Sequence, residues 1–383
     1  MQEQHIQDLN MLGIDIKLEH VVFCVKQIFK GYDIEIASWR CTDIDYKTPN
    51  FTTAGLYRLH GLAYVEGENM PWSIVVKIIK PDSSEKDDPR HHSYWKREAL
   101  VFRSNVLSDL PKSLHSVDCY LIEDRADGTI GLWMENIDGE NDNLWSQEDY
   151  CFIAQQLGLS NGAYLMGRSL PSESWICQNW LTSWVASSRM YAPNPYDYIH
   201  LINNDIDQIW KSYQIFNKHV DSMLKSLVHM PRVLAHQDLS QKNMFLHKTN
   251  SKNDQLILID WQFMSISGIG EDLGKLFGVN MSTNNIPQHK YEDYKNSIFE
   301  YYLQGLRETG WQGDERIARY GYCTSVAMRC VWEVPQFIYQ AAKLVEEPDN
   351  IILQERVSQL EKIIFIQMEM AKEAEDLKEY IKK

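Results

Sequence analysis

Several common sequence features are missing from this 383-residue chain. No apolar run approaches the roughly 20 residues that a membrane-spanning helix needs. The chain does not open with a basic segment followed by an apolar one, so no secretory signal is expected. The seven cysteines include no C-x-x-C pair, which argues against a zinc site or a disulfide framework. Reduced thiols in a cytoplasmic protein are expected instead.

Basic residues are also scarce relative to acidic ones. Lys and Arg number 38 against 53 Asp and Glu, so the formal net charge is -15 at pH 7. This balance disfavours nucleic acid and anionic membranes as partners. If the acids line a cleft, they favour a cationic ligand; the alternative, that acidity only aids solubility, stays open. The sequence does not indicate an oligomeric state.

Residues 234–262 carry the most informative pattern. Two apolar, β-like segments alternate with polar groups. His236, Asp238 and Asn243 follow the first segment, and Asp260 directly follows a short, apolar, β-branched run that is typical of a buried strand. This stretch therefore places two carboxylates and one carboxamide on a hairpin-like unit.

Phosphoryl transfer is the chemistry that this set of side chains suits. In that reaction the protein mainly positions a hydroxyl and neutralises phosphate charge. Asp238 would accept or orient the hydroxyl proton. Asn243 and Asp260 would hold Mg²⁺, which prefers hard oxygen ligands. The alternative is that Asp238 and Asn243 only cap a turn, with Asp260 at a strand end.

The segments H-Q-D-L-S-Q-K-N and I-D-W-Q resemble the catalytic and metal-binding loops of the aminoglycoside phosphotransferase and choline kinase group of small-molecule kinases. The spacing from Asp238 to Asn243 is that of the protein-kinase H-R-D motif, but Gln237 replaces the arginine and D-W-Q replaces D-F-G. These departures favour a small-molecule acceptor over a protein. The resemblance also implies structural roles for His236, which would bond nearby backbone, and for Asp272, which would cap a helix and tie it to the catalytic loop.

The resemblance implies an α/β (α+β) class with a bilobal, protein-kinase-like fold. Residues 1–135 would form a nucleotide-binding lobe with a five-stranded antiparallel sheet and one main helix. Residues 136–383 would form a mostly helical lobe with the catalytic loops and the substrate site. Strand patterns occur at 35–42, 56–65, 72–79, 116–124 and 129–135. Helical periodicity follows, opened by a capping pattern at Ser146 and predicted to break at Pro335.

Lys77 lies inside the strand pattern S-I-V-V-K-I-I, where a buried ammonium needs a partner. The resemblance assigns Lys77 to the α- and β-phosphates of ATP and pairs it with Glu98 from the next helix. The alternative places Lys77 at a strand edge and Glu98 on a solvated helix face.

Two further segments are assigned to the nucleotide. Thr52, Thr53 and Gly55 lie in the loop expected over the phosphates, where hydroxyl and backbone groups could bond phosphate oxygens. This loop lacks G-x-G-x-x-G, and an ordinary hairpin loop would look much the same. The resemblance also implies that the backbone of Glu135 and Ile137 bonds the adenine edge where the chain enters the second lobe.

The acceptor is a hydroxylated small molecule whose identity the sequence leaves open. Glu271, Asp272 and Glu333 favour an amine-bearing compound such as an aminoglycoside-like antibiotic. Choline, an amino alcohol or a sugar is the alternative, and choline would call for an aromatic cage. Trp180 and Trp184 would form either an aromatic wall of the substrate site or ordinary helix packing. A catalytically silent nucleotide-binding scaffold is the third hypothesis.

Overall fold

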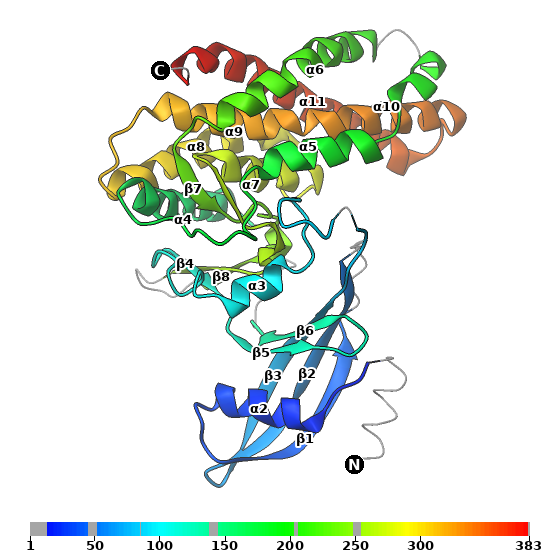
Figure 1. Cartoon of the computed structure of the whole chain (residues 1–383). Helices are drawn as coiled ribbons and strands as arrows, with labels where there is room; N and C mark the ends of the chain where they lie inside the picture. The colour runs from blue at the N-terminus through cyan, green and yellow to red at the C-terminus, as the bar shows by residue number, and fades with distance from the viewer. Residues whose placement is uncertain are drawn as a thin grey trace. The chain divides into compact units, whose positions relative to one another are not determined.

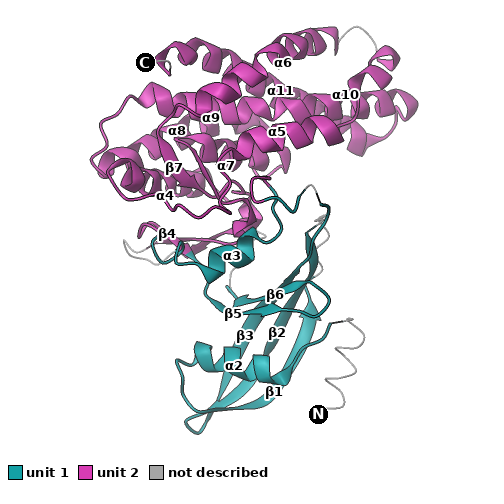
Figure 2. Ribbon diagram, in the orientation of Figure 1, with its two compact units in different colours: residues 1–88, 93–109, 116–139 teal, residues 89–92, 110–115, 140–383 magenta. Residues whose placement is uncertain are grey.

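The computed structural model describes residues 14–44, 52–84, 86–137, 145–202, 206–247 and 254–381. The chain forms two compact units, teal and magenta in Figure 2. Unit 1 comprises residues 1–88, 93–109 and 116–139, and unit 2 comprises residues 89–92, 110–115 and 140–383. Within the described ranges, none of the helices combines the length and the apolar character that crossing a bilayer requires.

Unit 1 is built on a five-stranded antiparallel sheet, as predicted. Its strands are β1 (Ile34–Asp43), β2 (Thr53–Val65), β3 (Glu68–Ile79), β5 (Cys119–Asp124) and β6 (Ile130–Glu135). They pair in the order β1-β2-β3-β6-β5, so β3 with Lys77 is the central strand. The β5–β6 turn contains Gly128 at φ +85°, a backbone conformation that favours glycine.

Two helices accompany this sheet. Helix α2 (Leu18–Ile28) buries Val21, Cys24 and Val25 in one apolar cluster with strand residues such as Ile74 (Figure 1). The sequence favours a helix that starts just after Pro89, but α3 (Arg97–Arg103) begins only at Arg97. The segment before it forms turns, so only the second half of the expected helix is present.

Unit 2 contains the long helices of the described chain. They are α4 (Gln147–Leu165), α5 (Trp180–Tyr191), α6 (Asp207–Leu227), α7 (Glu271–Ser282), α8 (Tyr291–Glu308), α9 (Glu315–Met328), α10 (Cys330–Glu346) and α11 (Ile351–Leu377). Helix α4 packs on α8, and α9 packs on both α7 and α11 (Figure 1). The capping box predicted at Ser146 is present, with Asp149 as its partner. The break predicted at Pro335 is wrong in position: the chain breaks at Arg329, between α9 and α10, and Pro335 lies inside α10.

Two small sheets in this part of the chain hold the polar stretch. Strands β7 (Arg232–Ala235) and β10 (Ser265–Gly268) pair antiparallel. Strands β8 (Met244–His247) and β9 (Gln255–Leu258) also pair antiparallel, and β4 (Leu114–Ser116) completes their sheet. The sequence pair Asn253-Asp254 favours a turn between β8 and β9, and Asn253 lies outside the described residues. Because these ladders join Ala235 to Ser265 and Met244 to Leu258, the two polar loops between them are brought together.

Helix α7 begins in close contact with α9, and glycine makes this approach possible. Gly270, immediately before α7, has φ +84°, and a Cβ there would lie 2.2 Å from the carbonyl oxygen of Ala318. A Cβ on Gly274 would lie 2.2 Å from Ser325 Oγ. Larger residues would push α7 outward. The first turns of α7, which carry Asp272 and Lys275, are therefore fixed against α9.

Candidate functional site

Asp238 lies in the loop between β7 and β8, and Asp272 holds the start of that loop. The Asp272 carboxylate accepts the backbone N–H groups of His236 and Gln237, both at 2.8 Å. Gln237 has φ +64°, a conformation that is costly for a non-glycine residue. The two bonds to Asp272 stabilise it, which confirms that Asp272 ties its helix to this loop. Asp238 itself is half-buried.

His236 joins this loop to the second one. Its Nδ1 accepts the backbone N–H of Asp238 at 3.2 Å, and its Nε2 donates to the carbonyl oxygen of Ile259 at 2.9 Å. Both bonds require a neutral ring. Burial lowers the pKa of His236 to about 4, although Asp260 acts in the opposite direction. The predicted structural role of His236 is confirmed.

Asn243 and Asp260 lie at neighbouring ends of the β8–β9 ladder. Asn243 Nδ2 donates to the carbonyl oxygen of Asp238 at 3.2 Å, and the N–H of Ile259 donates to the carbonyl oxygen of Asn243 at 3.0 Å. Asp260 adopts φ 60° and ψ 66°, the left-handed region. Asp238 and Asn243 thus belong to one hydrogen-bonded unit, which also includes Ile259, the residue before Asp260.

These donors fit magnesium. Among the described residues, no group of three or more His, Cys, Asp and Glu side chains could hold a metal ion. One carboxylate and one carboxamide form an incomplete set, and Mg²⁺ commonly uses such sets because water and phosphate oxygens fill its other positions. The amide nitrogen of Asn243 is bonded, so its oxygen is the atom suited to a cation.

The electrostatic surroundings of Asp238 suit a proton acceptor. Burial, and secondly the nearby charge of Asp260, raise the pKa of Asp238 to about 7. Lys242, Lys275 and a hydrogen bond from Asn243 lower it. A general base is most effective when its pKa lies near the working pH.

In unit 1, Lys77 and Glu98 form the ion pair that the sequence predicted. Lys77 Nζ lies 2.7 Å from Glu98 Oε2, and both side chains are almost fully buried. Lys77 belongs to the central strand β3 and Glu98 to the first turn of α3. The alternative of a strand-edge lysine and a solvated glutamate is therefore wrong.

The structure corrects the expected position of the residues assigned to the phosphate loop. Thr53 and Gly55 belong to β2, with a register shift between them, so they do not lie in a loop as predicted; Thr52 directly precedes the strand. Within the described part of the chain, the buried Thr53 Oγ1 has no hydrogen-bond partner. A buried hydroxyl without a partner fits a missing phosphate oxygen, and contact with phosphate stays a prediction.

Glu135 and Ile137 occupy the end of the sheet. Glu135 is the last residue of β6, and its N–H donates to the carbonyl oxygen of Asp118 at 2.8 Å. Ile137 follows two residues later and is half-buried. Contact between their backbone and adenine stays a prediction.

Two of the acids that suggested a cationic acceptor are occupied by protein groups. Glu271 Oε1 accepts the N–H of Gly268 at 2.6 Å and lies 3.9 Å from Arg232 Nη1. Asp272 accepts the two loop N–H groups described above. Both side chains are at most 3% exposed.

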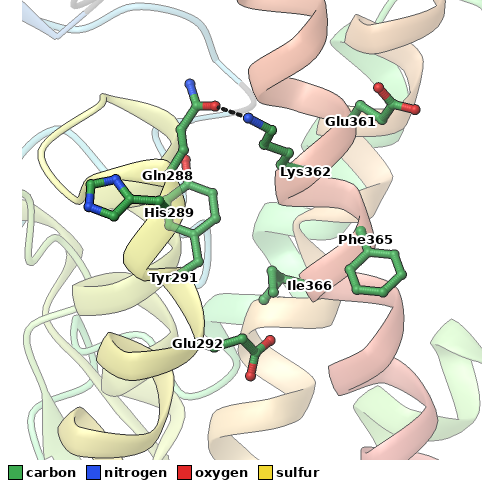
Figure 3. Close-up of a pocket in the computed structure, with 8 residues that line it drawn as sticks. All are labelled: Gln288, His289, Tyr291, Glu292, Glu361, Lys362, Phe365 and Ile366. Carbon is green, nitrogen blue, oxygen red and sulfur yellow. Dashed lines mark hydrogen bonds between the residues drawn. The ribbon is translucent and has the colours of Figure 1, made fainter.

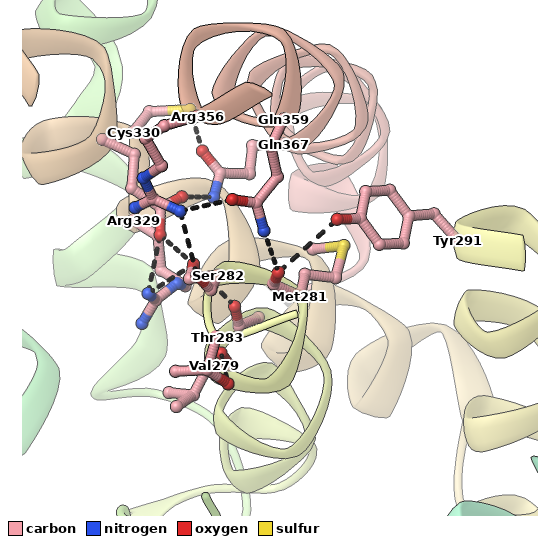
Figure 4. A network of polar contacts seen from close by, with 12 residues as sticks. Val279, Met281, Ser282, Thr283, Tyr291, Arg329, Cys330, Arg356, Gln359 and Gln367 are labelled. Carbon is pink, nitrogen blue, oxygen red and sulfur yellow. Dashed lines mark hydrogen bonds and ion pairs between the residues drawn. The ribbon is translucent and has the colours of Figure 1, made fainter. Parts of the chain in front are cut away.

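The third acid, Glu333, lies in a polar network between α7, α10 and α11. Arg329 Nη2 lies 2.7 Å from Glu333 Oε1, and both Ser282 and Gln367 donate hydrogen bonds to the same carboxylate. Figure 4 shows Arg329, Ser282 and Gln367 gathered in this network. Glu333 is 2% exposed, so it too is satisfied internally.

Sequence reasoning missed Lys275, which lies beside the site. Its Nζ is 3.9 Å from the ring centroid of Trp180 and 4.6 Å from that of Trp184. The two indoles are nearly parallel, at 12°. Phe263, from the loop after Asp260, contacts Trp180 with ring centroids 5.4 Å apart. The only available signal was the spacing from Asp272, because residues three apart share one face of a helix.

A separate surface groove of about 370 Å³ lies between the start of α8 and α11 (Figure 3). Lys362 Nζ donates to Gln288 Oε1 across it at 2.9 Å. It is lined by Gln288, His289, Tyr291, Glu292, Glu361, Lys362, Phe365 and Ile366. None of the predicted site residues is among them.

Together the two units define a class: the chain has the protein-kinase-like fold shared by aminoglycoside phosphotransferase and choline kinase-like small-molecule kinases. A choline kinase from Cryptosporidium parvum matches with a TM-score of 0.52 and 14% identity, covering 95% of this chain and 100% of that one. A microcompartment-associated aminopropanol kinase matches with a TM-score of 0.51 and 11% identity, covering 92% and 98%.

A third solved structure, an amicoumacin kinase in complex with AMP-PNP, Ca²⁺ and Ami, matches with a TM-score of 0.50 and 12% identity, covering 91% and 96%. At these identities the likeness establishes the fold, and it confirms the predicted fold class. A family model described as "DUF1679: Uncharacterized oxidoreductase dhs-27" matches residues 183–370, a segment that contains both polar loops. No curated protein matches the chain.

Proposed function

We propose that this protein is a small-molecule kinase that transfers the terminal phosphoryl group of ATP to a hydroxyl group, with Mg²⁺. The observation that carries this proposal is the hydrogen-bonded unit in which Asp238, Asn243 and the segment leading to Asp260 are joined through His236. The fold likeness to kinases, one of them solved with AMP-PNP and Ca²⁺, supports it.

The residues of unit 2 would perform the transfer. Asp238 takes the proton from the acceptor hydroxyl while the hydroxyl oxygen bonds to the terminal phosphorus and the bridging bond to the β-phosphate breaks. Oxygens of Asn243 and Asp260 would hold magnesium, which neutralises charge on the phosphates when bound. His236 stays neutral and keeps the two loops in register.

The first lobe, residues 1–135, would bind the nucleotide, and residues 136–383 would supply the catalytic loops and the acceptor site. Lys77, oriented by Glu98, would contact the α- and β-phosphates. Thr52, Thr53 and Gly55 would bond phosphate oxygens, and the backbone of Glu135 and Ile137 would bond adenine.

The acceptor candidates are an amine-bearing antibiotic, as in an aminoglycoside-like phosphotransferase, and a metabolic alcohol such as choline, an amino alcohol or a sugar. The fold neighbours include an amicoumacin kinase as well as kinases of choline and of aminopropanol.

A mass-shift screen tests the proposal. The full chain is incubated with ATP, Mg²⁺ and a panel of hydroxylated antibiotics and metabolites, and products with a phosphate-sized mass gain are sought. Asp238→Asn is expected to lower kcat by about 10²–10⁴-fold, the usual contribution of a general base, without weakening nucleotide binding. Asp349→Asn, an exposed aspartate elsewhere in unit 2, is the matched control and keeps full activity.

Two outcomes would contradict the proposal. Full turnover by Asp238→Asn would remove the proton acceptor. ATP binding without magnesium-dependent hydrolysis and without any phosphorylated product would favour the nucleotide-binding scaffold.

A further inference from the structure

Lys275 Nζ lies against two indole rings, an arrangement that proteins also use to recognise cationic ligands. Aromatic faces recognise ammonium groups when the cation lies within about 6 Å of the ring centroid. Lys275 Nζ satisfies this criterion for both Trp180 and Trp184. The pair of indoles is therefore already filled by an amine of the protein itself.

Lys275 is held there without a carboxylate in contact. It is 2% exposed, and within the described ranges no acidic oxygen lies at ion-pair distance from its Nζ. Burial lowers the pKa of Lys275 well below its usual range, and Arg329 lowers it further, whereas Asp238, Asp272 and Glu271 raise it. Protonated or neutral, the amine occupies the same space against the two indoles.

The acidic residues near Lys275 do not provide a separate binding site for a cationic acceptor. Glu271, Asp272 and Glu333 are each bonded to backbone N–H groups or to basic and polar side chains of the protein. Using any of them for an acceptor's amine would break buried hydrogen bonds, each of which is expensive to leave unmade. The overall charge of -15 attracts cations at long range, but the carboxylates of these three residues are already engaged by groups of the protein.

We infer that the acceptor carries no cationic group at the position next to Asp238: Lys275, seated on Trp180 and Trp184, selects uncharged or anionic hydroxyl compounds and excludes choline-like and aminoglycoside-like ones. This assignment rests on the proposed kinase activity and narrows its substrate class. It makes Lys275 a specificity-determining residue.

Matched pairs of alcohols that differ only in charge provide the kinetic test. Choline is compared with 3,3-dimethyl-1-butanol, and glucosamine with glucose, using the full chain, ATP and Mg²⁺. The wild type is expected to have at least tenfold higher kcat/KM for the uncharged member of a pair. Lys275→Met, which keeps length but removes the amine, is expected to reduce that ratio at least tenfold. Lys343→Met is the control, since Lys343 also lies over an aromatic ring, Tyr339 at 4.6 Å, but is exposed.

A binding measurement makes the test independent of turnover. Tetramethylammonium is titrated calorimetrically into the wild type, Lys275→Ala and Lys343→Ala. Saturable binding is expected only for Lys275→Ala, at least tenfold tighter than any binding to the other two proteins, because only this variant vacates the two indoles.

The outcomes separate the two levels of inference. A wild type that prefers the cationic members, a ratio unchanged by Lys275→Met, or equal tetramethylammonium binding by all three proteins would overturn the role of Lys275. Absence of any phosphorylated product and of Asp238-dependent ATP hydrolysis, together with the expected tetramethylammonium result, would overturn the kinase proposal alone.

Discussion

Lys77 in unit 1 and Lys275 in unit 2 are both buried, and the structure stabilises the two lysines differently. In unit 1, Lys77 makes a 2.7 Å ion pair with Glu98. In unit 2, Lys275 lies over Trp180 and Trp184, and its nearest acids act only at longer range. Lys77 is thus neutralised by contact, whereas Lys275 is stabilised by aromatic faces.

This difference bears on what each lysine can do. A buried ion pair fixes the geometry of both partners, and removing one partner leaves an uncompensated charge. Lys77 is therefore a fixed group that suits a constant part of a ligand, such as the phosphates of a nucleotide. Lys275 has no partner in contact and can be replaced without leaving a buried charge behind. The residue at such a position can differ between kinases that act on different acceptors.

The largest loss of stability is expected when the Lys77–Glu98 ion pair is broken. Lys77→Met should lower the free energy of unfolding by about 3–5 kcal/mol, because the buried carboxylate of Glu98 would lose its 2.7 Å contact with the ammonium. Chemical denaturation of the full chain, followed by circular dichroism, measures this change. Lys80→Met, at an exposed lysine just beyond β3, is the matched control and should change stability by less than about 0.5 kcal/mol.

The double variant Lys77→Met/Glu98→Leu sharpens this result. Because it removes both charges, it should recover most of the lost stability while leaving nucleotide binding weak. If Lys77→Met alone is as stable as the wild type, the contact pair does not stabilise unit 1, and the contrast with Lys275 disappears.

A smaller loss is expected one turn before Lys275. Asp272→Ala removes the acceptor of two buried N–H groups, from His236 and Gln237, and should cost about 2–3 kcal/mol. It should also lower kcat, since Gln237 would relax from positive φ and move Asp238. Asp272→Asn keeps one acceptor oxygen and should lose about half as much. Equal stability of the alanine variant and the wild type would show that Asp272 does not hold the loop.

The sequence predicted the parts of the molecule that depend on local patterns. Alternating apolar residues marked the five strands, and Ser146 marked the start of α4. The spacing of the polar residues within 236–260 was equally informative. A hairpin-like pair of strands brings the loops at its end together, and this does not depend on the packing of distant segments. Lys77 was recognisable since a lysine within an apolar strand requires a partner.

Features that depend on distant packing could not be predicted. Lys275 follows Asp272 in a helix, where most lysines are solvated, and only the approach of α5 places two indoles against it. Thr53 and Gly55 were assigned to a loop because a register shift in a strand leaves no clear sequence signal. The helix break was predicted at Pro335, which lies inside α10, whereas the break at Arg329 has no proline to mark it in the sequence.

Glu271 is a buried carboxyl group in unit 2, and its titration shows how burial changes the charge of an acid, as Lys275 shows for a base. Burial raises its pKa to about 7 from an ordinary value of 4.5, although Arg232 and the N–H of Gly268 lower it. The folded chain therefore keeps a proton that the unfolded chain loses between about pH 4.5 and 7. Stability from this group is fully present below about pH 4.5 and is lost as the pH rises past about 7.

Glu271→Gln should flatten the pH dependence in that window by roughly 1–2 kcal/mol. Thermal unfolding at pH 5 and pH 8 measures it, and Glu379→Gln, in the exposed part of the last turn, is the control. An identical difference between the two pH values in Glu271→Gln and the wild type would contradict the raised pKa.

The smallest change is expected at Lys275 itself. Lys275→Met should alter the free energy of unfolding by no more than about 1 kcal/mol, because it leaves no contacting carboxylate unpaired and methionine also packs well on aromatic rings. Denaturation of this variant beside Lys77→Met measures the contrast directly. A loss comparable to that of Lys77→Met would mean that Asp238 and Asp272 together act as a charge partner for Lys275. In that case, replacing Lys275 to change the acceptor specificity would also destabilise unit 2. The identity of this residue would then be constrained by folding and could not change freely with the substrate.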